Sequence, residues 1–311
     1  MGLFERAPGR VTIVEVGPRD GLQNEPAVIP TGAKVKLIEH LAEAGLPLIE
    51  ATAFVHPQAV PPMADAAEVL SRLRRRPGTR YLALVPNAKG YERARAAGAD
   101  EVAIFIAASE TFSQRNTRCS IAESLARVNE VITLARRERV PVRGYLSTAW
   151  YCPYEGRIDP AVAVRLACML LDAGVWQVSL GDTIGAATPH EVEALLASLL
   201  AAVPTAALAL HCHDTRGTAL ANVLVGLQLG LSTFDSSAGG LGGCPFAPGA
   251  AGNLATEDLV YLLDGMGIET GVSLEAVARA AASIEPLVGH PLPGRAYQAL
   301  RLAAHPSSPA S

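Results

Sequence analysis

Short apolar strand patterns alternate with longer helical patterns along nearly the whole chain, and this alternation restricts the fold more than any other feature. Eight segments have the pattern of strands: residues 11–16, 47–51, 81–85, 102–106, 140–146, 176–180, 207–211 and 233–236. Most are continuous runs of aliphatic and β-branched residues, as expected for strands buried on both faces. Eight strands in strict alternation with helices predict an α/β fold, a closed (β/α)8 TIM barrel. The alternative, a doubly wound sheet, lacks a G-x-G-x-x-G motif after the first strand.

Several helix starts carry their own signals. Ser120 with Glu123 and Thr188 with Glu191 have the spacing of capping boxes, in which each residue bonds to the other's backbone N–H. Asp159 precedes a proline and predicts the start of another helix.

The chain beyond the eighth strand is glycine-rich and then helical. We expect one catalytic domain over residues 1–300, with the barrel at about 11–240 and a loop and helices at about 241–300. A flexible tail is expected at 301–311. The glycines of residues 239–252 predict a mobile loop.

Composition excludes several classes of partner. A net charge of −4 without a basic block argues against nucleic acid binding. No apolar run reaches membrane-spanning length and no secretory signal is recognisable at the N-terminus. The five cysteines are odd in number and scattered, which favours a reducing, cytoplasmic location over a disulfide framework.

Lysine is scarce, which limits the chemistry. Lys34 and Lys36 lie on a predicted helix and Lys89 lies just past a strand. The sequence therefore offers no good candidate for a buried lysine at a strand end that could form a Schiff base.

Polar residues gather where strands of a barrel end, which is where TIM-barrel active sites lie. His211 and His213 are two apart on a strand, so both side chains point to the same face. Asp20, at the end of the first strand, adds a hard oxygen ligand. Two imidazoles and a carboxylate with open positions predict a divalent metal site for Mg²⁺, Mn²⁺ or Zn²⁺.

Three further charged residues are candidates for substrate contact. Arg19 lies in a Gly-Pro frame that would hold its guanidinium over the barrel mouth, where it can stabilise an enolate oxygen. Glu50 interrupts an apolar strand and is expected to anchor Arg19 or to contact substrate. Arg143 is expected to pair with a substrate carboxylate, and a structural ion pair inside the barrel is nearly as good an interpretation.

The segment at residues 236–249 places a lone cysteine, Cys244, among glycines and prolines. This composition favours a closing lid that carries a reactive thiol over a plain linker. Asn253, just beyond it, is in position to return a carbonyl oxygen to the metal.

These motifs together resemble the hydroxymethylglutaryl-CoA lyase family, within a superfamily of metal-dependent barrels that includes isopropylmalate and homocitrate synthases. The superfamily shares the Arg-Asp-Gly turn and the His-x-His pair. The lyases themselves are marked by residues 16–25 (VGPRDGLQNE), 152–156 (CPYEG) and 240–245 (GLGGCP). The resemblance runs from about Val11 to about Gly271.

The resemblance implies a function and a set of site residues. It implies cleavage of 3-hydroxy-3-methylglutaryl-CoA, an acyl-CoA thioester, to acetoacetate and acetyl-CoA, as in leucine degradation, with Mg²⁺ or Mn²⁺ as cofactor and a homodimer as the assembly. The family's metal ligands fall on Asp20, His211, His213 and Asn253. Its catalytic arginine and cysteine fall on Arg19 and Cys244, and its substrate-side glutamate on Glu50.

Some questions stay open at this level. The base that takes the substrate hydroxyl proton is either His211 or the Cys244 thiolate. Trp150 and Tyr151 stand where animal members have smaller residues, and we expect them to reshape the pocket. The alternatives are therefore a related lyase for a bulkier 3-hydroxyacyl-CoA, or a condensing acyl-CoA synthase.

Overall fold

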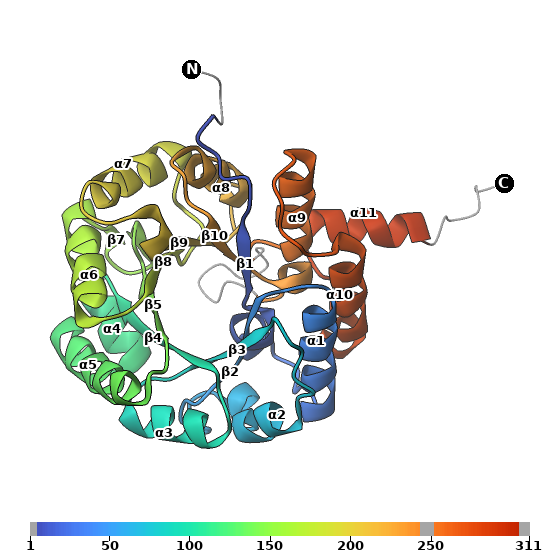
Figure 1. Cartoon of the computed structure of the whole chain (residues 1–311), viewed down its shortest axis with the longest axis horizontal. Coiled ribbons are helices and arrows are strands. Elements are labelled where there is room, and N and C mark those ends of the chain that lie inside the picture. The colour runs from blue at the N-terminus through green and yellow to red at the C-terminus, as the bar shows by residue number, and fades with distance from the viewer. Residues whose placement is uncertain (1–4, 243–251, 305–311) are drawn as a thin grey trace.

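The computed structural model describes residues 5–242 and 252–304, and eight parallel strands form its centre. The strands close into a barrel in the order β1-β10-β9-β8-β5-β4-β3-β2 (Figure 1). Their bounds are β1 Thr12–Glu15, β2 Leu48–Ala53, β3 Arg80–Leu84, β4 Glu101–Ala107, β5 Val142–Ser147, β8 Gln177–Asp182, β9 Leu208–Cys212 and β10 Thr233–Ser236. The predicted TIM barrel is confirmed, and each predicted strand overlaps an observed one.

Helices surround the barrel as a ring (Figure 1). They are α1 Thr31–Glu43, α2 Ala66–Arg72, α3 Ala88–Ala96, α4 Glu110–Thr117, α5 Ile121–Glu138, α6 Pro160–Ala173, α7 Pro189–Leu200 and α8 Ala219–Gln228. A small hairpin, β6 Tyr151–Cys152 and β7 Gly156–Arg157, precedes α6. Three more helices follow the last strand: α9 Thr256–Gly265, α10 Leu274–Val288 and α11 Arg295–Ala304. Of these three helices, α10 packs against α1 of the ring.

The helix-start signals of the sequence are present as hydrogen bonds. Ser120 Oγ accepts from the Glu123 N–H, and Glu123 accepts from the Ser120 N–H, which forms the predicted capping box of α5. Thr188 and Glu191 form the second box, at α7. Asp159 accepts from the N–H of Ala161 at the start of α6.

The boundary of the tail differs from the expectation. Helix α11 continues to Ala304, so residues 301–304 are helical. Residues 305–311, and residues 243–251 of the glycine-rich loop, lie outside the described residues.

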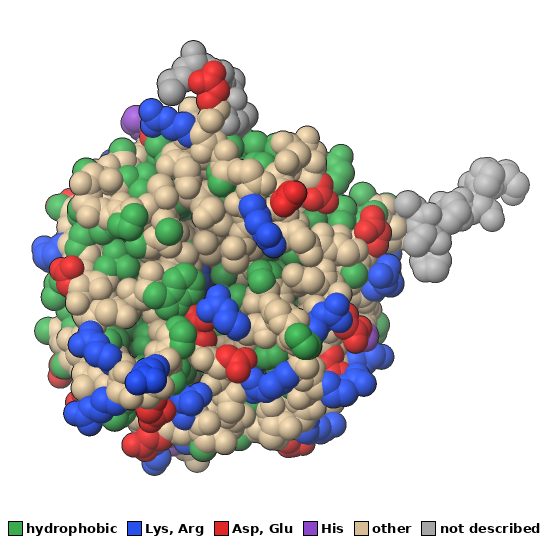
Figure 2. Space-filling model, in the orientation of Figure 1, with side chains coloured by type: hydrophobic (Ala, Val, Ile, Leu, Met, Phe, Trp, Pro, Cys, Tyr) green, Lys and Arg blue, Asp and Glu red, His purple; other side chains and the backbone are tan. Residues whose placement is uncertain are grey.

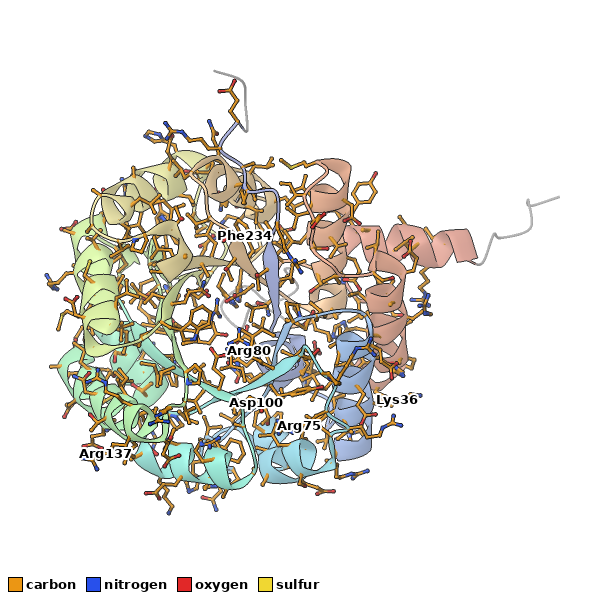
Figure 3. All side chains as sticks on the ribbon, viewed as in Figure 1. Lys36, Arg75, Arg80, Asp100, Arg137 and Phe234 are labelled. Atoms are coloured by element: carbon orange, nitrogen blue, oxygen red, sulfur yellow. The ribbon has the colours of Figure 1, made fainter. Side chains whose placement is uncertain are left out.

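Helix α1 accounts for two of the three lysines, as predicted. Lys36 is exposed and points outward from α1 (Figure 3). Lys34 is buried and donates to the carboxylate of Asp65, which ties α1 to the segment that begins α2. Neither lysine faces the barrel mouth.

The surface shows no single-sign field on the face drawn in Figure 2, where basic and acidic side chains are interspersed. This distribution agrees with the absence of a basic block from the sequence. In the part of the chain that the structure describes, no helix is long and apolar enough to cross a membrane.

A buried carboxylate at the end of β1 joins three parts of the chain. Glu15 Oε1 accepts from the N–H groups of Gly17 and Ala238, at 2.8 and 2.9 Å, and Oε2 accepts from the hydroxyl of Thr256 at 2.7 Å. The turn after β1, the segment after β10 and the start of α9 are therefore fixed to one side chain. Burial, only partly offset by these donors, raises the pKa of Glu15 to about 7.

Glu257 lies beside this junction and has fewer partners. Its Oε2 accepts from the N–H of Gly239 at 2.7 Å, whereas Oε1 is buried with no hydrogen-bond partner among the described residues. Burial raises the pKa of Glu257 to about 8.

The pKa of Glu257 predicts a specific pH dependence of stability. Between its ordinary value of 4.5 and about 8 the folded protein holds a proton on Glu257 that the unfolded chain has lost. Wild-type stability should therefore fall as the pH rises through this window, by up to roughly 5 kcal/mol from this group. Glu257→Gln removes this contribution. The melting temperature of the variant should therefore rise relative to that of wild type as the pH increases from 5 to 8. A constant difference across that range would contradict the assignment.

Candidate active site

A single turn of π-helix, Gly17–Gly21, follows β1 and carries two adjacent charged residues. The N–H groups of Arg19, Asp20 and Gly21 all point at the carbonyl oxygen of Val16, at 3.1, 2.7 and 3.3 Å. This wide turn projects the side chains of residues 19 and 20 over the C-terminal end of the barrel, and π-turns of this kind are common at functional sites.

The Arg19 guanidinium is held between two carboxylates. Its Nε donates to Glu50 Oε2 at 2.7 Å and its Nη1 donates to Asp20 Oδ1 at 2.5 Å. The register of β2 against β3 shifts between Glu50 and Thr52, which is the signature of a β-bulge. Because Arg19 donates to its carboxylate, Glu50 anchors Arg19, which is the first of the two roles expected for it.

Asp20, His211 and His213 come together at the barrel mouth. Their ligand atoms lie within 4.8 Å of one another. The Nε2 atoms of the two histidines lie 3.8 and 3.9 Å from Asp20 Oδ2, which is longer than a hydrogen bond. One carboxylate and two imidazoles that converge at these distances are suited to a divalent cation.

The electrostatics of Asp20 and His213 suit metal binding. Burial alone would raise the pKa of Asp20, but the charge of Arg19 and the two histidines lower it below its usual range. Burial and the neighbouring His211 lower the pKa of His213 to about 4. Near neutral pH, Asp20 is therefore ionised and His213 neutral, the forms that a metal requires.

His211 has a second acidic neighbour, Asp235. Its Nδ1 lies 3.3 Å from Asp235 Oδ2, and its Nε2 faces Asp20. Burial alone would lower the pKa of His211, but Asp235 and Asp20 outweigh burial and raise it. A carboxylate behind a ligating imidazole fixes the orientation of the ring and increases its basicity.

Asn253 reaches the same site from the far side of the glycine-rich loop. Residues 252–254 run beside the end of β9, where the Asp214 N–H donates to Gly252 and the Leu254 N–H to Cys212. Asn253 Nδ2 donates to Asp20 Oδ2 at 3.0 Å. The amide of Asn253 therefore touches the carboxylate of the expected metal centre.

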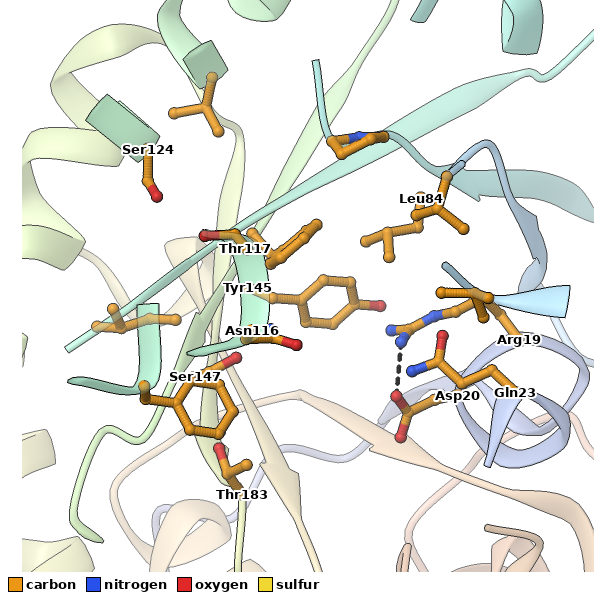
Figure 4. Close-up of a pocket in the computed structure, with 18 of the residues that line it drawn as sticks. Arg19, Asp20, Gln23, Leu84, Asn116, Thr117, Ser124, Tyr145, Ser147 and Thr183 are labelled. Atoms are coloured by element: carbon orange, nitrogen blue, oxygen red, sulfur yellow. Dashed lines mark hydrogen bonds and ion pairs between the residues drawn. The ribbon is translucent and has the colours of Figure 1, made fainter. Parts of the chain in front are cut away.

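A cavity of about 440 Å³ opens beside these residues. Arg19 and Asp20 line one end, and Thr117 and Ser124, from the α4–α5 region, line the other (Figure 4). Tyr145 on β5 points its hydroxyl toward Arg19 between them (Figure 4).

Tyr145 is a residue that the sequence reasoning missed. Its hydroxyl is buried with no hydrogen-bond partner among the described residues, although its ring lines the cavity. The ring centroid lies 5.5 Å from the Arg19 guanidinium and 5.1 Å from that of Arg143. The available signal was its position two residues after Arg143, on the same face of β5.

Arg143 does not reach the cavity, which corrects the expectation that it binds substrate. It is fully buried, and its guanidinium donates to both oxygens of Asp235, at 2.7 and 3.1 Å, and to Gln177. The structure shows the alternative, an ion pair inside the barrel. Asp235 was also missed, and its signal was an acidic residue inside a predicted apolar strand.

Trp150 and Tyr151 also lie elsewhere than expected. Trp150 Nε1 donates to the carbonyl of Glu191, and the Tyr151 hydroxyl donates to the Glu191 carboxylate at 2.6 Å. Both side chains bind the start of α7, and neither lines the cavity. The expected reshaping of the pocket by these two residues is therefore wrong.

Comparison with known proteins identifies the family of this chain. The family model described as HMGL-like matches residues 10–284. The chain belongs to the HMGL-like family. It is 57% identical to the mitochondrial hydroxymethylglutaryl-CoA lyase of Rattus norvegicus over 273 residues, which cover 88% of this chain and 84% of the relative. The predicted family resemblance is confirmed.

Solved structures of the family have the same fold. The HMG-CoA lyase of Bacillus subtilis superposes with a TM-score of 0.94 at 49% identity, covering 95% of this chain and 99% of that one. An HMG-CoA lyase of Acinetobacter baumannii, solved with coenzyme A and 3-methylmalate, gives a TM-score of 0.89 at 37% identity, with 97% of each chain covered.

The residues expected from the HMGL-like family divide into those the structure describes and one it does not. Arg19, Asp20, His211, His213 and Asn253 meet at the barrel mouth, and Glu50 binds Arg19. Cys244 lies outside the described residues.

The cluster predicts that His213 contributes to metal affinity. His213→Ala should weaken Mn²⁺ binding by at least about 100-fold, because the loss of an outer partner alone typically costs 10–100-fold. Electron paramagnetic resonance of free Mn²⁺ measures this. His56→Ala is the control, since His56 lines the same cavity but is not part of the cluster. Equal Mn²⁺ affinity in both variants would remove His213 from the metal site.

Proposed function

We propose that this protein cleaves 3-hydroxy-3-methylglutaryl-CoA to acetoacetate and acetyl-CoA. The observation that carries the proposal is the Arg19–Asp20 turn, which lies against the His211 and His213 pair at one end of a cavity. Relatives that are 55–57% identical to this chain over the matched residues are named for this reaction.

A divalent cation, Mg²⁺ or Mn²⁺, is the proposed cofactor. The partly buried carboxylate and the two imidazoles fit such an ion, and Asp20, His211, His213 and Asn253 would hold it. When bound, the cation supplies a Lewis acid that lowers the pKa of the substrate's C3 hydroxyl.

Arg19 is the proposed stabiliser of the developing negative charge. Burial alone would lower its pKa, but Glu50 and Asp20 raise it, so the guanidinium remains charged. Glu50, which is fully buried and does not line the cavity, fixes the orientation of Arg19. A preorganised cation aimed at an enolate oxygen costs no reorganisation during the reaction.

The proton transfers are assigned to Cys244. Both ring nitrogens of His211 face carboxylates, Asp20 and Asp235, which leaves no nitrogen directed at substrate. This arrangement favours the Cys244 thiolate over His211 as the base that takes the C3 hydroxyl proton.

The bond changes balance within the substrate. Loss of the hydroxyl proton forms the C3 ketone of acetoacetate, and the electron pair of the C2–C3 bond becomes the enolate of acetyl-CoA. Arg19 holds the enolate oxygen, and the proton carried by Cys244 returns to the C2 carbon. No external oxidant or reductant is needed.

The alternative of a bulkier substrate loses its support, because Trp150 and Tyr151 bind Glu191 and do not line the cavity.

We also infer a homodimer and a cytoplasmic location. Three large apolar side chains on the C-terminal helices, Tyr261, Leu287 and Leu302, are exposed, which supports an assembly. The four described cysteines are free, which supports a reducing compartment.

A turnover assay tests the proposed reaction. Purified protein should release acetoacetate and acetyl-CoA in equal amounts from 3-hydroxy-3-methylglutaryl-CoA when Mg²⁺ or Mn²⁺ is present, and release neither after chelation. Metal binding without cleavage would contradict the proposed substrate.

The role of Arg19 makes a quantitative prediction. Arg19→Gln should lower kcat by about 10²–10³-fold, because one charge-stabilising donor is lost from the transition state. Steady-state kinetics measure this. Arg75→Gln is the matched control, since Arg75 also pairs with a carboxylate, Asp100, but on the exposed surface. A decrease in kcat of less than about tenfold would mean that Arg19 has only a structural role.

A further inference from the structure

Glu25 is a buried acid just beyond the catalytic turn, and it is not part of the cavity wall. It is 5% exposed. Its Oε1 accepts from the N–H of Gly242 at 3.3 Å, and its Oε2 lies 2.8 Å from Nε2 of His290, in the segment between α10 and α11. Three segments that are distant in the sequence therefore meet at one carboxylate.

His290 supplies the charge that balances Glu25. Its Nε2 faces the Glu25 carboxylate, and its Nδ1 lies 3.0 Å from the carbonyl oxygen of Pro291. Both partners are acceptors, and a neutral imidazole has only one N–H to donate. The form of His290 that donates to both acceptors is the doubly protonated, cationic ring, and the same two contacts raise its pKa.

The Gly242 N–H belongs to a peptide unit whose other end reaches the metal centre. The carbonyl of that same unit, Leu241 C=O, accepts from Asn253 Nδ2 at 3.2 Å and from Ser237 Oγ at 2.9 Å. A peptide unit is planar, so a bond that fixes the N–H also fixes the direction of the C=O. Glu25 thus sets the direction of the carbonyl that holds Asn253.

Close packing transmits this orientation. Gly242 has φ +99°, and a Cβ there would lie 3.0 Å from Asn253 Nδ2 and 3.0 Å from Gly21 Cα. The backbone of the catalytic turn and the amide of Asn253 therefore touch Gly242 directly. The Leu241–Gly242 peptide is therefore packed closely against both.

We propose that Glu25, balanced by His290, is a positioning residue that orients the Leu241–Gly242 peptide and, through it, the amide of Asn253 at the metal centre. Asn253 Nδ2 donates to Leu241 and to Asp20, and an amide's orientation follows from its hydrogen bonds. With the nitrogen held by the Leu241 carbonyl, the amide oxygen is left available as a ligand. The effect on turnover rests on the proposed function, whereas the effect on metal affinity does not.

Mn²⁺ affinity of the metal-free full-length protein tests the proposal. Glu25→Ala should raise the Kd for Mn²⁺ by about 10–100-fold, the usual cost of losing a partner of a ligand. Glu25→Gln, which keeps an acceptor for the Gly242 N–H, should lose less. His290→Gln should fall between wild type and Glu25→Ala, and His290→Arg should restore the wild-type value by returning the cation.

Glu39 and Arg74 offer a matched control. They form the same kind of pair, with a side-chain exposure of 10% for the acid and 83% for the cation, on α1 and just after α2. Glu39→Ala should lower the melting temperature without changing the Mn²⁺ affinity. If Glu25→Ala behaves in the same way, Glu25 is structural and the proposal is wrong.

A double-mutant cycle tests the route through Asn253. If Glu25 acts through that amide, Glu25→Ala should add no further loss of Mn²⁺ affinity to Asn253→Ala, whereas additive losses would overturn the proposal. Should Glu25→Ala not fold, His290→Gln decides, because the His290 side chain is 45% exposed and its replacement is mild. Unchanged Mn²⁺ affinity in His290→Gln would then overturn the proposal. Absence of 3-hydroxy-3-methylglutaryl-CoA turnover in wild type, with the Mn²⁺ pattern intact, would contradict only the proposed substrate.

Discussion

The site depends on one cation, the Arg19 guanidinium, placed between two carboxylates, the fully buried Glu50 and the partly buried Asp20. Glu50 and Asp20 would repel each other at the barrel mouth if nothing positive separated them, and burial alone would protonate both. Because Arg19 contacts both, Asp20 stays ionised. An isolated ion pair this deep contributes little net stability, so its value lies in fixing charge and direction.

A second buried ion pair continues the polar contacts of the site into the barrel. Arg143 and Asp235 neutralise each other below the site, and Asp235 also faces His211. The interior of the barrel is thus a continuous set of polar contacts from Arg143 to the expected metal ligands. Such a set orients an imidazole more firmly than packing alone, because each hydrogen bond restricts the next.

The sequence predicted those parts of the molecule that depend on local pattern. Residues close together in the sequence form the patterns of the eight apolar strands, the two capping boxes and the His211–His213 pair. The structure contains all of these features. The partner of Arg143 could not be predicted in this way, because Asp235 is 92 residues away and only barrel closure brings them together. Trp150 was misplaced for the same reason, since its partner Glu191 lies on another βα unit.

The π-turn after β1 shows why strand length matters for chemistry. In a strand, successive side chains point to opposite faces, so an Arg-Asp pair could not serve one site. Strand β1 ends at Glu15, and the turn then lets residues 19 and 20 approach the same cavity in different directions. One more residue of extended chain would send one of the two charges into the surrounding helices. The length of the first strand is therefore itself under functional constraint, and insertions there should be tolerated far less than in the outer loops.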